Sequence, residues 1–178
     1  MATHSEAILS EEISANMVGC ARDAAALLDV SLEADPRAIV ERIDAFVFDW
    51  QCGKRPPREV IDPEDAPFVL GSLWGEQLVR RFGWEWRMVT FHDHDDTVAP
   101  GVLSPDRALA VYPIHFLIGC LADSSVDATI LLSFNILAAG EIGVLPRGGY
   151  CNLMDGVQRI VPRIATTPKN PWWRRIIG

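Results

Sequence analysis

The sequence predicts an α+β fold in which five or six helices pack on a small antiparallel β-meander. Apolar residues recur at spacings of three and four in several long segments, which is typical of helices with one buried face. Between residues 84 and 92, WEWRMVTFH, the spacing changes to two, which is typical of a strand. The chain has 178 residues, of which 49% are hydrophobic, and this length suits one domain over residues 1–178.

Three layers are expected within this domain. Residues 1–61 form an N-terminal helical layer, residues 62–122 a helix with the β-meander, and residues 123–178 the C-terminal helices and tail. The first helix is expected over residues 5–29, with an apolar stripe that runs from Ile8 to Leu28. The second begins after Asp35, an N-cap residue followed by proline, and Gly53 ends it.

The third helix is expected to start with the same device, Asp62 followed by Pro63, and to end at Gly83. Two glycines, Gly71 and Gly75, lie four residues apart inside it. Each costs about 1 kcal/mol relative to alanine in a helix interior. We therefore expect another part of the backbone to approach this helix closely.

The meander follows directly. A strand over residues 84–92 leads to a polar turn, HDHDDT, and a short strand at Val102 and Leu103 precedes the returning strand 108–112. Further helices are expected over residues 113–122, 126–138 and 152–161.

Charge and composition exclude several classes of function. The net charge of −8 argues against a nucleic-acid partner, which would require a basic face, and is compatible with a basic protein partner. No apolar run reaches the roughly 18 residues of a membrane span, and the N-terminus lacks a secretory signal pattern. The four cysteines form no C-x-x-C pair, so reduced thiols and a cytoplasmic location are expected.

One cluster combines residue types that bind metals, namely His92 and His94 with neighbouring aspartates. Histidines two apart on a strand face the same side and are weak candidates for a transition-metal site. A charged hairpin tip is the plainer interpretation, because His4 and His115 belong to no partnering motif. We expect no metal and no other cofactor.

Nucleophilic catalysis has no clear sequence support. The chain contains neither a G-x-S-x-G elbow nor a phosphate-binding loop. Cys120 and His115 lie five apart in an apolar segment, which indicates core packing and a buried histidine. No catalytic residue is therefore assigned.

The segments LGSLWGEQLVRRFGWEW (70–86) and LAVYPIHFLIGCL (109–121) together resemble a family of small bacterial domains of uncharacterised function. In that family a helix with an LGxxxGE motif runs into a G-W strand, and a later strand ends in Tyr/Phe-Pro before another helix. The resemblance covers roughly residues 65–122. Such domains are found among the immunity proteins of polymorphic toxins and type VI secretion effectors. The shared residues are structural, so the resemblance implies a binding role.

We therefore expect a cytoplasmic immunity protein that binds and occludes a cognate toxic effector with a basic surface. The candidate contacts are Asp93, Asp95 and Asp96 at the hairpin tip, with Trp172 and Trp173 as aromatic anchors. A solvated turn and a docked tail are the plainer interpretations of these residues. The alternatives are an enzyme of unknown chemistry that uses His92 and His94, and an adaptor or assembly protein. The sequence gives no oligomeric state.

Overall fold

A computed structural model describes residues 3–155 of the chain and confirms the α+β class. Its helices are α1 (Glu11–Leu27), α2 (Pro36–Gln51), α3 (Ala66–Phe82), α4 (Pro113–Ala122) and α5 (Ile130–Ala139). Its strands are β1 (His4–Ala7), β2 (Glu85–Phe91), β3 (Thr97–Leu103), β4 (Leu109–Val111) and β5 (Cys151–Asn152).

The five strands form one sheet in the order β1-β2-β3-β4-β5. The pairs from β1 to β4 are antiparallel, but β5 pairs with β4 in parallel. The predicted antiparallel meander is confirmed in β2, β3 and β4, but the whole sheet is mixed because β5 joins it in parallel. The parallel strand arises because the chain leaves the sheet through α4 and α5 and returns to its edge much later.

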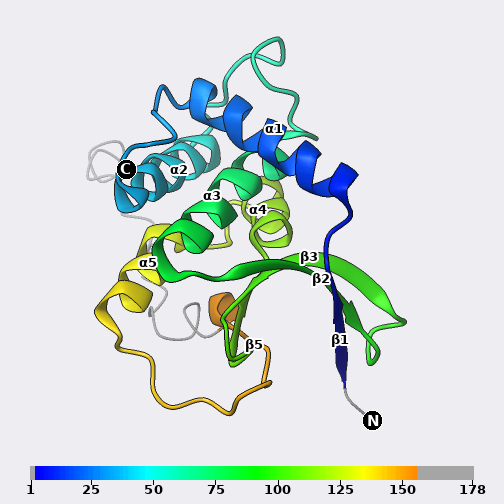
Figure 1. The fold of residues 1–178 in the computed structure, drawn as a ribbon. Helices are drawn as coiled ribbons and strands as arrows, with labels where there is room; N and C mark the ends of the chain where they lie inside the picture. The colour runs from blue at the N-terminus through cyan, green and yellow to red at the C-terminus, as the bar shows by residue number, and fades with distance from the viewer. Residues whose placement is uncertain (1–2, 156–178) are drawn as a thin grey trace, which may run out of the picture.

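The helices lie on one side of the sheet (Figure 1). The segment after α5, yellow to orange in Figure 1, passes below the sheet on the side away from α1 and α3 and then forms β5. One large cluster of buried side chains has members from all five helices and from the inner face of the sheet. A second, smaller cluster contains Val89, Leu103, Ala110 and Tyr112 from β2, β3, and β4 with the residue that follows it. The outer face of the sheet, which carries this second cluster, is bordered by His115 of α4 and by the helical residues 153–155.

The beginning of the chain differs from the expected helix over residues 5–29. His4 to Ala7 form the edge strand β1, which pairs with β2 in the register His4 to Phe91. Helix α1 starts only at Glu11, because the extended Ser10 accepts a hydrogen bond from the Ile13 N–H (3.3 Å) and so caps the helix. Ile8, assigned to the apolar stripe, is 80% exposed.

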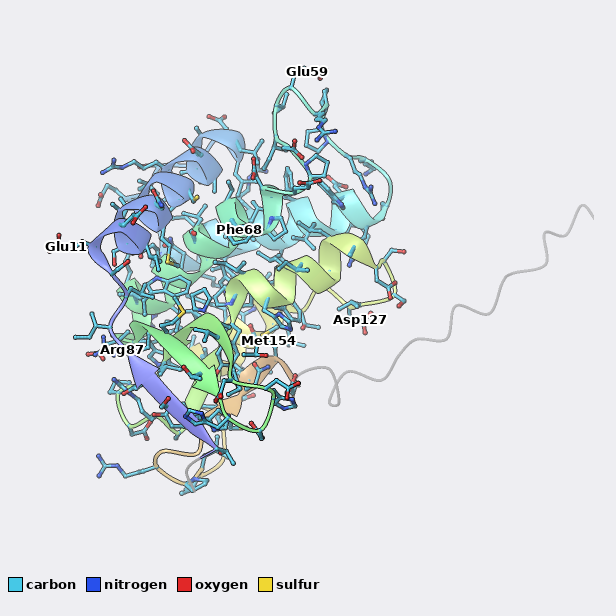
Figure 2. All side chains as sticks on the ribbon, turned by 90° about the vertical axis from the view of Figure 1, so that its right-hand side faces the viewer. Glu11, Glu59, Phe68, Arg87, Asp127 and Met154 are labelled. Atoms are coloured by element: carbon cyan, nitrogen blue, oxygen red, sulfur yellow. The ribbon has the colours of Figure 1, made fainter. Side chains whose placement is uncertain are left out.

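Helix α3 also begins later than expected, at Ala66. Asp62 instead closes a turn in which its side chain accepts the Glu64 N–H (3.1 Å) and its carbonyl accepts the Asp65 N–H (3.0 Å). The connector before it projects away from the helices, with Glu59 at its tip (Figure 2). The end of α3 is as predicted, since Gly83 adopts a left-handed conformation with φ of 67°.

The close approach predicted from the glycines of α3 is confirmed. A Cβ atom at Gly71 would lie 2.9 Å from the backbone N and Cα of Ile114, so α4 crosses α3 at this point. A Cβ atom at Gly75 would overlap the indole ring of Trp86 from β2. The two glycines are therefore the positions where α4 and the sheet contact α3.

Helix α5 spans Ile130–Ala139 rather than residues 126–138, and another helix provides its cap. Asp44 of α2 accepts a hydrogen bond from the Leu131 N–H (3.0 Å), whereas Thr129 at the N-cap position makes no side-chain cap bond. A sequence pattern cannot show this contact, because 87 residues separate donor and acceptor.

Strand β3 (Thr97–Leu103) is longer than the strand predicted at Val102 and Leu103. It includes Pro100. Strand β4 pairs only with Val102 and Leu103, so Pro100 lies where β3 has a neighbour on one side alone. Of the helix expected over residues 152–161, Asn152 belongs to β5, residues 153–155 are helical as predicted, and the rest lies outside the described residues. Within residues 3–155, no helix combines the length and apolar character needed to cross a membrane.

Candidate functional site

The hairpin between β2 and β3 presents its acidic residues on a well-defined turn. The His94 N–H donates to the Phe91 carbonyl (3.2 Å), and the Thr97 N–H and hydroxyl both donate to the His94 carbonyl (2.9 and 2.6 Å). Asp95 and Asp96 have φ of 51° and 53°, a conformation that aspartate tolerates better than most residues. The turn is therefore fixed by local hydrogen bonds.

The same turn is bonded to the edge strand through His92. The Nδ1 atom of His92 lies 2.6 Å from the Asp96 carboxylate, and its Nε2 atom lies 3.0 Å from the Ser5 hydroxyl. Because an ionised carboxylate can only accept hydrogen bonds, His92 donates one from Nδ1. In the neutral ring, Nε2 then accepts a hydrogen bond from the Ser5 hydroxyl. This serine–histidine–aspartate order matches the hydrogen bonds of a hydrolase triad. All three side chains are exposed. The two hydrogen bonds of His92 also join the turn to β1, and they are called the clamp below.

The basic side chains of β2 and of the turn after β3 lie toward the other end of these strands from the tip, where Glu85 is opposite Leu103, and they are already paired. Between Arg87 and Arg107 the sequence contains no lysine or arginine. Arg107 donates to Glu6 (3.1 Å) and Glu85 (2.9 Å), and Arg87 donates to Glu85 (2.7 Å). The bond from Arg107 and the charge of Arg87 lower the pKa of Glu85.

The negative charges of Asp93 and Asp95 are not paired in this way among the described residues. Within residues 3–155, neither side chain takes part in a hydrogen bond or an ion pair, and both are exposed. The tip therefore carries uncompensated negative charge on a fixed backbone. An arrangement of this kind can attract a basic surface before contact.

A cavity of about 600 Å³ opens on the outer face of the sheet, beside the hairpin tip. Its lining includes six rings, an amide and a carboxylate, namely His4, Phe91, His94, Tyr112, His115, Tyr150, Asn152 and Asp155. Four of the rings contact one another: the ring centroids of His4 and Tyr150 are 5.3 Å apart in a stack, and those of Phe91 and Tyr112 are also 5.3 Å apart. Three of the four histidines of the chain thus lie around one cavity.

Tyr112 is the most buried polar side chain of this cavity. It is 6% exposed, and its hydroxyl has no hydrogen-bond partner among residues 3–155. Burial, followed by the nearby Tyr150 and Asp155, raises the pKa of Tyr112, so the group stays a neutral phenol. Its ring rests on Gly101, where a Cβ atom would lie only 2.7 Å from a ring carbon. The backbone of β3 thus makes room for Tyr112.

The described residues do not arrange these groups as a metal centre. No group of three or more histidine, cysteine, aspartate or glutamate side chains in residues 3–155 is placed to hold a metal ion. Cys120 is buried, and burial raises its pKa to about 12, so it is a poor nucleophile at neutral pH. Cys120 lies in the core as expected, but the expectation of a buried His115 was wrong, because this side chain is exposed at the cavity.

The sequence-predicted residues are thus distributed over two neighbouring places. Asp93, Asp95 and Asp96 lie at the exposed tip, His92 belongs to the clamp, and His94 lines the cavity. Trp172 and Trp173 lie outside the described residues. Sequence reasoning missed the cavity, whose lining comes from β1, β2, α4 and the segment around β5. Only the alternation in residues 84–92, which puts Val89 and Phe91 on one face, pointed to this side of the sheet.

Comparison of the chain with protein-family models, with curated proteins and with solved structures gave no match.

Proposed function

We propose that the protein is a cytoplasmic immunity protein that binds a cognate toxic effector and occludes its active site. The observation that carries the proposal is the hairpin tip, where Asp93 and Asp95 are exposed and uncompensated on a turn fixed by hydrogen bonds. The family resemblance of residues 65–122 adds support. The effector is expected to present a basic surface to this tip.

The fixed turn bears directly on binding. Charges at the rim of an interface raise the association rate through long-range attraction and exclude partners of like charge. A turn whose backbone is already ordered loses less conformational entropy on binding than a mobile loop. The clamp between His92 and Ser5 contributes to this order because it joins the turn to β1.

The proposal is tested with the product of the gene adjacent to this one. Co-expression should yield a stable complex, and the wild-type protein should protect cells from that product. The double substitution Asp93→Asn and Asp95→Asn should weaken both effects. A matched control is Glu59→Gln with Glu64→Gln, which removes the same charge from the exposed connector far from the tip. Equal loss in both double variants, or no complex with the wild-type protein, would refute a role for the tip.

A second candidate, hydrolysis, is favoured by the hydrogen bonds that join Ser5, His92 and Asp96. In such a reaction Ser5 would attack a carbonyl group while His92 accepts its proton. A fluorophosphonate probe tests this role, since it modifies only an activated serine. Labelling that Ser5→Ala and His92→Ala both abolish would support hydrolysis. An unlabelled protein would leave the three residues as a structural clamp.

A further inference from the structure

The cavity on the outer face of the sheet has a definite chemical character. Its walls are aromatic, and its charged lining group is the carboxylate of Asp155. That carboxylate is held by a hydrogen bond from Asn152 Nδ2 (3.2 Å). No lysine or arginine lines the cavity within the described residues, so an anionic ligand would find no permanent positive charge there.

The Tyr112 hydroxyl is a buried polar group at the wall of the cavity, without a partner among the described residues. A buried hydroxyl without a partner is unfavourable, and native structures rarely retain one without a reason. Tyr112 is more than nine-tenths buried and lines the cavity. The hydroxyl is closed off from the cavity in the structure, so a bond to a ligand requires a small shift of the ring, after which the phenol can donate or accept a hydrogen bond.

Aromatic faces and a carboxylate together select for positive charge. A cation is attracted to the negative face of an aromatic ring, and more strongly where water is excluded. His94 and His115 also line the cavity, and an imidazole nitrogen that carries no proton can accept a hydrogen bond from an N–H donor. The pair of Tyr150 and His4, already stacked at 5.3 Å, offers a flat surface to a ligand ring.

We propose that this cavity binds a small organic ammonium ion that carries an aromatic ring. The ammonium group lies against the Asp155 carboxylate, with the Tyr112 hydroxyl turned toward it by a small shift, and the ring packs against Tyr150 and Phe91. The volume of about 600 Å³ falls within the range of cavities that bind small molecules. The site is separate from the exposed carboxylates of the tip, so it does not depend on the immunity function.

Three probes with the same phenol ring test the assignment by calorimetry on the full chain: tyramine, 4-ethylphenol and 4-hydroxyphenylacetate. They differ in that the first carries a positive charge, the second none and the third a negative one. Tyramine should bind at least about tenfold more tightly than 4-ethylphenol, and the anion should not bind. Equal binding of the charged and neutral probes, or no binding of tyramine at millimolar concentration, would overturn the proposal.

Two substitutions locate the probe. Asp155→Asn should weaken tyramine binding about tenfold, and Tyr112→Phe should weaken it severalfold while retaining the ring. Asp127→Asn is the matched control: it removes the same charge at the turn before α5 (Figure 2) and should leave tyramine binding unchanged. Unchanged affinity in both cavity variants would overturn the assignment of the site.

A further arm separates a free amine from the basic side chain of a protein. N-acetyl-lysine methylamide presents the same ammonium group on an aliphatic stem and should bind more weakly than tyramine, because it lacks the ring that packs on Tyr150. Tighter binding of the lysine derivative would contradict a small-molecule site and would point to a side chain of a partner.

Discussion

The indole of Trp86 lies directly on Gly75, so that the sheet contacts α3 where the helix has no side chain. The ring is held there by a hydrogen bond from its Nε1 atom to Glu76 (3.1 Å). A Cβ atom at position 75 would overlap the ring. Gly75→Ala should therefore lower the free energy of unfolding by about 1–3 kcal/mol, despite the higher helix propensity of alanine. Urea denaturation measures this change.

Gly19 of α1 provides the matched control. A Cβ atom there would meet nothing within 4 Å. Gly19→Ala should therefore raise the free energy of unfolding, by up to about 1 kcal/mol. If both substitutions changed stability in the same direction, the close contact between α3 and the sheet would not be real.

Asp44 should contribute to stability as the cap of α5. Asp44→Ala removes the acceptor for the Leu131 N–H and should lower the free energy of unfolding by about 0.5–2 kcal/mol. Asp44→Asn keeps an oxygen acceptor at that position and should lower it less. Thermal or urea denaturation of the two variants distinguishes the cap from a purely electrostatic role, for which Ala and Asn would be equivalent.

The ionisation of Asp44 also gives a dependence on pH. Burial raises the pKa of Asp44 above its ordinary value of 3.8, so the folded protein holds this proton more tightly than the unfolded chain. The stabilisation of the folded state that comes from this tighter proton binding is fully present below pH 3.8 and is lost as the pH rises through the pKa of Asp44 in the folded protein. The stability of the wild type relative to Asp44→Asn should thus fall from pH 3.8 towards neutral pH. A difference that rises over this interval would contradict the burial of Asp44.

His92 should affect the local opening of the edge strand β1 more than the free energy of unfolding of the whole protein. His92→Ala removes the bonds to Ser5 and Asp96, which are exposed, so the loss in unfolding free energy should stay below about 1 kcal/mol. Hydrogen exchange at the β1 amides should nevertheless become faster. The matched control is His94→Ala, which leaves those bonds intact. Unchanged exchange in His92→Ala would show that the clamp does not hold β1.

The cysteines should differ in reactivity according to burial. Cys52 and Cys151 are exposed, whereas Cys120 is buried with its pKa raised to about 12. A disulfide reagent should therefore modify Cys52 and Cys151 in the folded protein and Cys120 only after unfolding. Mass spectrometry of labelled peptides reports each site. Rapid labelling of Cys120 would contradict its place in the core.

Much of the helical layer was predictable because its signals are local. Asp35 with Pro36 marks the start of α2, Gly83 marks the end of α3, and Pro113 starts α4. The errors occurred where a distant part of the chain decides the structure. Residues 4–7 form a strand only because β2 offers an edge, and α5 begins where Asp44 of α2 caps it.

The candidate site was only partly predictable for the same reason. The acidic tip follows from the run HDHDDT alone, because a hairpin turn needs polar residues. The cavity requires His4, Tyr112, His115 and Asp155 to meet across strands and a helix that are far apart in sequence. The bonds of His92 to Ser5 likewise span 87 residues, so no motif could reveal them.

The most direct test of the proposed function is the rate at which the protein associates with the product of the adjacent gene, measured by stopped flow at several salt concentrations. For the wild type the rate should be high and should fall steeply with salt, because the uncompensated Asp93 and Asp95 attract a basic surface. In the Asp93→Asn and Asp95→Asn double variant the rate at low salt should be about tenfold lower, with a weaker dependence on salt. Equal rates and equal salt dependence in the two proteins would contradict binding through the hairpin tip.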